Sequence, residues 1–508
     1  MTVTHPAPTT LLELFASSPA DRTAIVVPER DLRVTYGALR NQVEACAEAL
    51  AACGVRRGDR VGIALSNGLP TIVSFLAASI AGTAAPLNSS YKEDEFRFYL
   101  EDTAARFIML PPDGADEARK AAASGVTILT VDTDESGSVR ISPAGGRASM
   151  SPPSVDDVAL ILHTSGSTGR PKRVPLTHAQ LSISAVNVAN TYALSSDDVS
   201  LCVMPLFHVH GLVASTLATL ATGGTVVVPS KFNPLSFWRV ARDYGATWYS
   251  AVPTLHQLLV ARADPGARPA GAERLRFIRS CSAALSPQLM SDLEAAFGAP
   301  VLEAYGMTEA AHQMASNPLP PAARKAASVG PNTGTTEISI MDAAGNHLKP
   351  GDRGEVVIRG ANVIRGYENN PDANAWSFID GWFRTGDQGF LDPDSYLLLT
   401  GRLKEMINRG GEKISPREVD EVLLAHPAVA EAVAFGVPHP AWGEEVAAAV
   451  VLRPDASASA SDLLSYCRER LADFKRPKQI FLTSAIPRTA TGKIQRRVVA
   501  EAFASAAQ

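Results

Sequence analysis

The chain has 508 residues and a mass of 53.6 kDa, which is too long for one hydrophobic core and predicts at least two domains. Hydrophobic residues make up 46% of the chain and charged residues 19%, a balance typical of globular proteins rather than disordered ones. The formal net charge is -5, and no basic tail or stripe is present, so nucleic-acid binding is not expected.

Targeting signals give little reason to place the chain outside the cytoplasm. The first ten residues lack the basic and then apolar pattern of a secretory signal. Prolines and small residues interrupt the uncharged stretch at 66–91, which therefore predicts a buried helix rather than a membrane span. The five cysteines show no metal-ligand spacing, and their odd number favours reduced thiols. We expect a cytoplasmic monomer or homodimer without stable membrane insertion.

The first four-fifths of the chain alternates short β-rich runs with helical patterns. Strands are predicted at 23–27, 60–64, 106–109, 199–203, 224–228 and 275–279, and helices at 36–52 and 94–102. This alternation is typical of α/β proteins, and it predicts a large N-terminal domain of layered sheets with mostly parallel strands.

The pattern then changes. Short strands at 355–359 and 396–400 lie among turn residues and predict a small β-barrel-like unit. A small mobile α+β domain is expected from a helix at 416–425, strands at 429–436 and 445–452, and a helix at 461–471 capped by Ser461. We therefore divide the chain into residues 1–401 and 402–508, with the functional site in the cleft between them.

The most informative segment is a polar loop at 164–172, which reads Thr-Ser-Gly-Ser-Thr-Gly-Arg-Pro-Lys and follows the apolar run 158–162. Hydroxyl and backbone N–H groups interleaved with glycines can surround phosphate oxygens, and Lys172 adds a positive charge. A Ser/Thr/Gly cluster alone is more often a flexible polar turn. Neither a Walker A loop nor a dinucleotide-binding glycine pattern fits the segment.

Four further blocks follow in order: Tyr-Gly-Met-Thr-Glu at 305–309, Gly-Trp-Phe-Arg-Thr-Gly-Asp at 381–387, Gly-Arg-Leu-Lys-Glu at 401–405, and Thr-Gly-Lys-Ile at 491–494. Together with the loop they resemble the acyl-adenylate-forming (AMP-binding) superfamily, which includes acyl-CoA synthetases, peptide-synthetase adenylation domains and firefly luciferase. The resemblance covers nearly the whole chain. It implies an ATP site formed by Thr164, Ser165, Gly166, Ser167, Thr168, Lys172, Glu303, Ala304, Tyr305, Gly306, Met307, Thr308, Asp387, Arg402 and Lys493.

Individual residues suit the parts of the nucleotide. Tyr305 offers a flat face for adenine, although a lone tyrosine is usually only packed in a core. Asp387 can accept hydrogen bonds from both ribose hydroxyls, and Arg402 can bridge ribose and phosphate. Outside these blocks, we would interpret the same aspartate as a turn former.

The resemblance assigns the chemistry to Lys493, Thr308 and Glu309. Glu309 is the implied ligand of the magnesium ion that accompanies ATP, and Lys493 neutralises charge at the attacking carboxylate and the α-phosphate. A carboxylate attacks the α-phosphorus, pyrophosphate leaves, and an acyl-adenylate forms. The small domain is then expected to rotate about a hinge at Lys404 and to present a second face for a thiol.

Coenzyme A is the expected thiol, because no carrier-protein domain is seen in the chain. Its predicted site consists of Gly411, Trp442, Arg476 and Lys478, where an aromatic ring and cations suit adenine and phosphates. An ordinary solvated charge run explains the same basic residues equally well.

The acid pocket departs from the common Ser-Gly-Gly-Ala pattern, since residues 279–283 read Arg-Ser-Cys-Ser-Ala. The larger side chains predict a short, partly polar pocket. Its candidate acid-binding residues are His208, Ser280, Ser282, His312 and Lys493, with His210 nearby. Core histidines held by the backbone are the competing interpretation.

These pocket blocks are similar to those of the oxalate–CoA ligases of plants and fungi, within the acyl-CoA synthetase branch. Oxalate is therefore the expected acid, with a short- or medium-chain fatty acid as the alternative. A luciferase-like oxygenase and a ligand-binding pseudo-enzyme are the other classes. Two positions differ from relatives: Gly306 stands where some oxalate–CoA ligases have alanine, and Arg173 where the superfamily usually has glycine.

Overall fold

The structure is a computed structural model that describes residues 9–122, 125–143, 148, 150–164, 171–264, 266–454, 456–489 and 494–504. The strands of the first two sheets are β1 (Thr23–Val27), β2 (Leu32–Thr35), β3 (Arg60–Ile63), β4 (Thr83–Pro86), β5 (Phe107–Leu110), β6 (Thr127–Thr133), β7 (Val139–Ser142), β8 (Val158–Thr164), β9 (Lys172–Thr177), β10 (Val199–Leu201), β11 (Thr225–Val227), β12 (Trp248–Ala251), β13 (Phe277–Ser280), β14 (Val301–Met307) and β15 (His312–Ser316). The later strands are β16 (Glu337–Met341), β17 (Gly354–Arg359), β18 (Phe378–Ile379), β19 (Trp382–Leu391), β20 (Leu397–Arg402), β21 (Ile407–Arg409), β22 (Glu412–Ile414), β23 (Val429–His439), β24 (Gly443–Leu452) and β25 (Gln479–Leu482). The α-helices are α1 (Tyr36–Ala52), α2 (Leu69–Ala81), α3 (Glu93–Asp102), α4 (Asp116–Ala122), α5 (His178–Thr191), α6 (Ala218–Leu220), α7 (Phe237–Tyr244), α8 (Pro253–Val260), α9 (Pro287–Phe297), α10 (Pro371–Ser377), α11 (Pro416–Leu424), α12 (Ala460–Arg468) and α13 (Arg496–Ala504).

Two large sheets organise the N-terminal part. One has the strand order β7-β6-β5-β3-β4-β8-β9 and the other β15-β14-β13-β12-β10-β11-β1-β2. The inner strands of both sheets run parallel, and antiparallel strands lie at the edges. The predicted α/β fold class with mostly parallel sheets is confirmed.

Helices cover both faces of each sheet. The apolar side chains of α1, α2 and α5 fill the space between the two sheets, while α3 and α4 pack outside the first and α7, α8 and α9 outside the second. Strand β5 shows how the alternation of side chains divides the layers: Phe107 and Met109 enter the central core, and Ile108 enters the outer one. The N-terminal part of the chain thus forms five alternating layers of helices and sheets.

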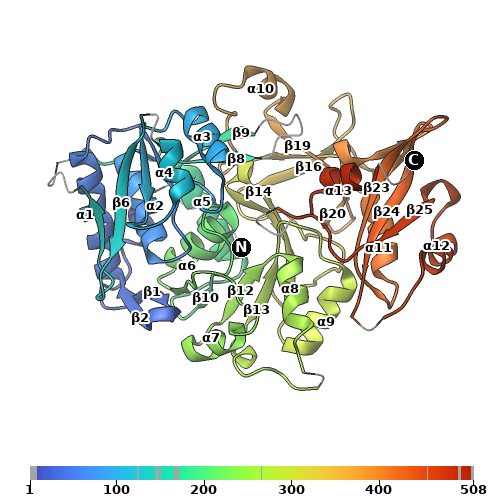
Figure 1. The fold of residues 1–508 in the computed structure, drawn as a ribbon, viewed down its shortest axis with the longest axis horizontal. Helices are drawn as coiled ribbons and strands as arrows, with labels where there is room; N and C mark the ends of the chain where they lie inside the picture. The colour runs from blue at the N-terminus through green and yellow to red at the C-terminus, as the bar shows by residue number, and fades with distance from the viewer. Residues whose placement is uncertain are drawn as a thin grey trace.

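The C-terminal third adds two smaller sheets. Strands β16-β17-β19-β18, with β20 beside β19, form one sheet, and β22-β21-β24-β23, with β25 beside β24, form the last. Figure 1 shows this last sheet, in orange and red with α11 and α12, at one end of the long axis, opposite the blue N-terminal elements. One face of this sheet packs apolar side chains of β21 to β25 against α11 and α12, and the other face packs side chains of β23 and β24 against α13.

Most predicted elements are present, but the cap of α12 was wrong. The uncharged stretch at 66–91 contains the buried helix α2, and none of the helices described is long and apolar enough to cross a membrane. The α12 helix begins earlier than predicted, because the Ser459 hydroxyl accepts a hydrogen bond from the Asp462 backbone N–H and the Asp462 carboxylate accepts one from the Ser459 backbone N–H. Ser461 lies inside the helix and is exposed.

This cap can be tested with two serines on one helix. We expect Ser459→Ala to destabilise α12 by about 1 kcal/mol, close to a fivefold increase in local opening, because a helix N-terminal N–H loses its acceptor. Hydrogen exchange of the α12 amides measures the opening. Ser461→Ala is the matched control and should leave exchange unchanged; equal effects of both substitutions would contradict the assignment.

Candidate functional site

The stems of the predicted phosphate loop are an antiparallel pair. Thr164, the last residue of β8, lies opposite Lys172, the first residue of β9. The predicted loop residues Ser165, Gly166, Ser167 and Thr168 lie outside the described residues, and so does Lys493. The two stems emerge from the carboxyl end of β8, the edge where parallel sheets place their ligand sites.

Glu309 lies beside this stem pair and is buried. Its Oε1 accepts a hydrogen bond from the Tyr367 hydroxyl at 2.8 Å and lies 3.4 Å from Thr164 Oγ1. Lys172 Nζ lies 4.4 Å from the centre of the Tyr367 ring. The carboxylate and hydroxyl oxygens are hard donors of the kind that magnesium prefers, so Glu309 with Thr164 fits a magnesium site next to a cation that can meet phosphate.

The positive charge of Lys172 interacts with that of Lys404, the predicted hinge residue. Burial lowers the pKa of Lys172, the Glu309 carboxylate raises it, and the positive charge of Lys404 lowers it again. Lys404 is in the short helix Leu403–Glu405, directly after β20. Lys404, the predicted hinge residue, is therefore electrostatically coupled to Lys172 at the stem of the predicted phosphate loop.

Tyr305, Asp387 and Arg402 form a second contact group. The Tyr305 hydroxyl donates a hydrogen bond to Asp387 Oδ2, and Arg402 Nε lies 3.1 Å from Asp387 Oδ1. Burial raises the pKa of the Tyr305 hydroxyl well above its usual range, so the hydroxyl remains a donor. Strands β14, β19 and β20 thus bring together the three residues predicted for adenine and ribose.

The other predicted nucleotide residues all lie on or next to β14. Glu303 is fully buried, accepts a hydrogen bond from the Leu285 backbone N–H at 3.0 Å, and has a pKa raised by burial to about 7. Ala304, Gly306, Met307 and Thr308 continue the same segment. A side-chain carbon on Gly306 would lie 2.1 Å from the backbone oxygen of His312, so this backbone excludes alanine here.

Arg173, where the superfamily usually has glycine, joins a cluster of opposite charges behind the phosphate loop. Its guanidinium donates to the backbone oxygen of Asp102 at 2.6 Å and lies 3.3 Å from Glu368 Oε2. Glu368 also pairs with Arg60. On β8, opposite Arg173, His163 Nε2 lies 3.1 Å from Asp102 Oδ2. Sequence reasoning gave Arg173 no role, and the structure assigns it to the support of the loop stems.

The acid-pocket residues surround a buried cation. Arg279, in the middle of β13, is completely buried, and its three nitrogens donate to Tyr192 Oη (2.8 Å), Ser250 Oγ (3.0 Å) and Gln313 Oε1 (3.0 Å). Sequence reasoning missed this role, although an arginine directly after the apolar pair Phe277-Ile278 in a predicted strand was the available signal.

Two histidines and a serine complete this group. His210 Nδ1 lies 3.0 Å from Ser282 Oγ and its Nε2 lies 2.6 Å from Ser250 Oγ, while the rings of His210 and His312 are 5.4 Å apart. We call Arg279, His210, His312, Ser282, Ser250, Gln313 and Tyr192 the Arg279 cluster.

Two of the predicted acid-binding residues, His208 and Ser280, are not members of the Arg279 cluster. His210, rather than His208, contacts the cluster; His208 is half-buried and its ring lies 4.7 Å from that of Phe207. Ser280 follows Arg279 on β13, so its side chain points to the other face of the sheet. The Ser280 hydroxyl is buried without a hydrogen-bond partner among the described residues.

Backbone strain gathers at the same place. Ser282 has φ 71° and His312 has φ 123°, both in the region that normally requires glycine. Neither residue is glycine, so each conformation costs free energy that other contacts must offset. Strain of this kind is often found at functional sites, and it marks Ser282 and His312 as candidates for a functional role.

The predicted coenzyme A residues lie in the connections between elements of the C-terminal domain, next to the strands of its sheet. Gly410 has φ 58°, and a side-chain carbon there would lie 2.7 Å from the Trp442 ring, so the glycine allows the ring to pack on the backbone. Arg409 lies over the same ring at 5.1 Å, and the ring is 47% exposed. Gly411 and Lys478 are exposed, and Arg476 pairs with Asp473 at 2.9 Å.

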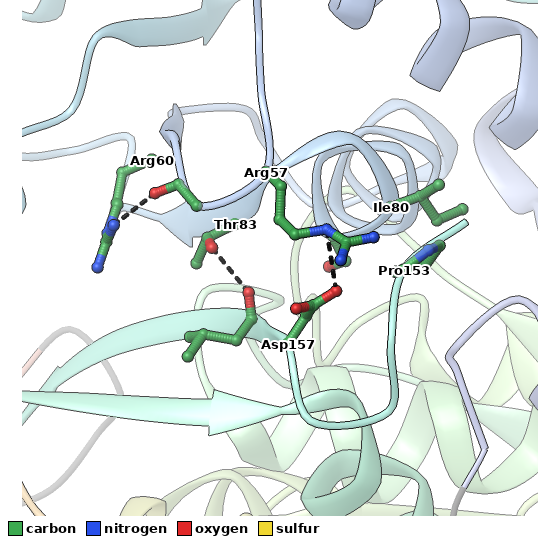
Figure 2. A pocket seen from close by; sticks show the side chains of 10 residues that line it. Arg57, Arg60, Ile80, Thr83, Pro153 and Asp157 are labelled. Carbon is green, nitrogen blue, oxygen red and sulfur yellow. Dashed lines mark hydrogen bonds and ion pairs between the residues drawn. The ribbon is translucent and has the colours of Figure 1, made fainter. Parts of the chain in front are cut away.

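A cavity of about 110 Å³ lies at the opposite edge of the first sheet (Figure 2). Arg57 and Asp157 form an ion pair of 3.3 Å on its wall, and Arg60 and Thr83 are the first residues of β3 and β4. The cavity therefore lies at the amino ends of these parallel strands, away from the phosphate loop. None of the predicted ATP, acid or coenzyme A residues lines it.

The ion cluster around Arg173 leads to a test. We expect Arg173→Met to weaken ATP binding about tenfold, because Asp102 and Glu368 lose a buried partner and the loop stems lose support. Calorimetric titration with ATP measures the change. Arg106→Met, which removes an exposed pair with Asp59, is the control and should bind ATP normally. Unchanged affinity in Arg173→Met would show that the cluster does not support the site.

Comparison with known proteins agrees with this geometry. The family model "AMP-binding enzyme" matches residues 12–368, and "AMP-binding enzyme C-terminal domain" matches residues 418–493. The chain is 48% identical to the probable CoA ligase CCL9 of Humulus lupulus (97% of this chain, 96% of that one) and 45% identical to the oxalate–CoA ligase of Arabidopsis thaliana (97% and 98%). The ATP-bound crystal structure of MatB from Rhodopseudomonas palustris superposes with a TM-score of 0.90 at 29% identity, covering 99% of this chain and all of that one. The chain belongs to the AMP-binding enzyme family.

Proposed function

We propose that this AMP-forming acid–CoA ligase uses oxalate as its acid. One carboxylate oxygen of oxalate attacks the α-phosphorus of ATP, and pyrophosphate leaves with the electrons of the broken P–O bond. The coenzyme A thiol then loses its proton and attacks the oxalyl carbonyl, which releases AMP and forms oxalyl-CoA. The observation that carries the choice of acid is the pair of strained residues Ser282 and His312 within the Arg279 cluster.

The positive φ of Ser282 supports a polar acid. Glycine would adopt φ 71° without strain, and serine differs from glycine at this position only by a CH₂OH group. Its Oγ lies within hydrogen-bond distance of His210, so the extra group adds a polar atom to the pocket. An alkyl chain offers no hydrogen-bond acceptor to these polar groups, whereas a carboxylate accepts hydrogen bonds.

The charge of the cluster supports a dianion. Arg279 is buried, and no carboxylate among the described residues forms an ion pair with it. A buried cation favours a nearby anion, since the low polarity of the surroundings strengthens the attraction. The second carboxylate of oxalate can supply that negative charge while the first one reacts.

The nucleotide half of the site is suited to activating a carboxylate. When bound, magnesium neutralises phosphate charge, and Glu309 with Thr164 would hold it. Lys172 adds a cation beside them, and Asp387 with Arg402 fits the ribose. For Lys493, we propose the role implied by the resemblance: charge neutralisation where the acid attacks the α-phosphate.

We also propose where coenzyme A binds and that the protein works in the cytoplasm. Trp442 presents an exposed ring beside Arg409, which suits an adenine base, and the small domain turns about Lys404 to bring this face to the adenylate. Five unpaired cysteines fit a reducing compartment such as the cytoplasm.

The choice of acid can be tested by ATP/pyrophosphate exchange with a panel of acids. We expect oxalate to support exchange best. Malonate, one methylene longer, and glycolate and acetate, which lack the second carboxylate, should be at least tenfold poorer. Highest exchange with hexanoate would identify a fatty acid ligase and contradict the polar pocket. Luminescence without coenzyme A would indicate an oxygenase instead.

A second test separates strain from function. Ser282→Gly should raise the KM for oxalate about 10- to 100-fold through loss of the hydroxyl, without lowering the melting temperature, because glycine relieves the positive φ. Steady-state kinetics and thermal unfolding measure the two effects. Ser395, exposed in a turn with φ 65°, is the matched control: Ser395→Gly relieves similar strain and should keep the KM. An unchanged KM in Ser282→Gly would remove the serine from the acid site.

A further inference from the structure

The hydrogen bonds of Arg279 indicate which of the neighbouring nitrogen atoms carry a proton. A guanidinium has only N–H donors, so every atom that faces it at short distance must be an acceptor. Besides its three closest partners, Arg279 lies 3.5 Å from His210 Nε2 and 3.4 Å from His312 Nδ1. Both of these ring nitrogens therefore face a donor and should carry no proton.

The tautomer of His210 follows from a chain of contacts. Ser250 Oγ accepts from Arg279, so its own proton is available for His210 Nε2 at 2.6 Å. The remaining proton of a neutral His210 is then on Nδ1, which donates to Ser282 Oγ at 3.0 Å. Because Ser282 accepts from His210, its hydroxyl proton is available to an acceptor other than His210.

The same reasoning gives His312 the opposite tautomer. Its Nδ1 faces the Arg279 guanidinium, so the proton of a neutral ring is on Nε2. One buried cation thereby fixes the tautomers of both histidines. In each ring, the N–H group is on the side away from Arg279. A carboxylate, which only accepts hydrogen bonds when ionised, is the matching ligand.

We propose that Arg279 is a positioning residue that holds His210 and His312 neutral, each in one tautomer, so that the acid pocket presents hydrogen-bond donors. The benefit to substrate binding rests on the oxalate function proposed above, whereas the tautomers themselves do not. Arg279 acts through Ser250 and the histidines and does not need to touch the acid.

Neutrality follows from the charges around the rings. Among the described residues, the titratable groups in contact with Arg279 include His210, His312, Tyr192 and Cys281, and no carboxylate forms an ion pair with it. Burial raises the pKa of Tyr192, which therefore stays a neutral phenol. The positive charge of Arg279 then opposes a second positive charge on either imidazole.

Kinetics of Arg279→Met provide the first test. The KM for oxalate should rise about 10- to 100-fold at pH 8, while the KM for ATP stays unchanged and reports a folded nucleotide site. Without the guanidinium, the histidines can gain a proton as the pH falls toward 6, and a cationic imidazole attracts a dianion. The defect should therefore shrink at low pH, whereas the wild-type KM stays flat. A defect that is constant with pH, or that raises both KM values equally, would overturn the proposal.

Ser250→Ala tests the relay with the charge left in place. It removes the hydroxyl between Arg279 and His210, so the KM for oxalate should rise about tenfold with no pH dependence. The matched control is Ser200→Ala on the adjacent strand β10, since Ser200 is also buried and its hydroxyl has no hydrogen-bond partner among the described residues. Equal effects of the two substitutions would overturn the relay.

Nitrogen-15 NMR of the histidine rings needs no substrate. His210→Gln and His312→Gln assign the two signals among the ten histidines. At pH 7 we expect an Nδ1–H tautomer for His210 and an Nε2–H tautomer for His312 in the full chain. Protonated rings or the opposite tautomers would overturn the inference. If the tautomers are as expected but oxalate is not a substrate, only the proposed function fails.

Discussion

Burial of the Arg279 guanidinium, which has no carboxylate partner in the part of the chain that the structure describes, is the constraint on which the proposed acid site depends. Moving a cation out of water costs several kcal/mol even after relaxation, so neutral dipoles must replace the lost water. In this molecule those dipoles are the hydroxyls of Tyr192 and Ser250, the amide oxygen of Gln313 and the imidazole nitrogens. Arg279 therefore requires the negative end of each neighbouring dipole to face the guanidinium.

The two halves of the site balance charge in different ways. Near the phosphate loop, cations and carboxylates alternate: Arg173 contacts Asp102 and Glu368, and Lys172 lies near Glu309. Such a cluster is satisfied before a ligand arrives and stiffens the loop stems. In the Arg279 cluster, the closest described partners of the cation are two hydroxyls and an amide oxygen. The first arrangement suits positioning of a large nucleotide, and the second suits attraction of a small anion.

Much of this could be predicted from the sequence, because ordered blocks identify the nucleotide residues and hydrophobic periodicity locates the elements. The helix at 36–52 was predicted with the observed bounds. The choice between His208 and His210 could not be made, because it depends on the turn that precedes the π-helix His210–Leu217. Arg279 was missed for a related reason: its partners come from β12, β15 and the end of α5, which are far apart in sequence. The capping serine of α12 was misplaced by two residues because several serines compete for the position.

The conformation of Ser282 also bears on how such a pocket is maintained over generations. Glycine is the relaxed residue at φ 71°, so random mutation followed by selection for stability alone would tend to replace the serine. Under the proposed function, the hydroxyl persists only while growth depends on the acid. In a duplicated copy free of that demand, position 282 would be among the first to drift, and the pocket would widen toward longer acids.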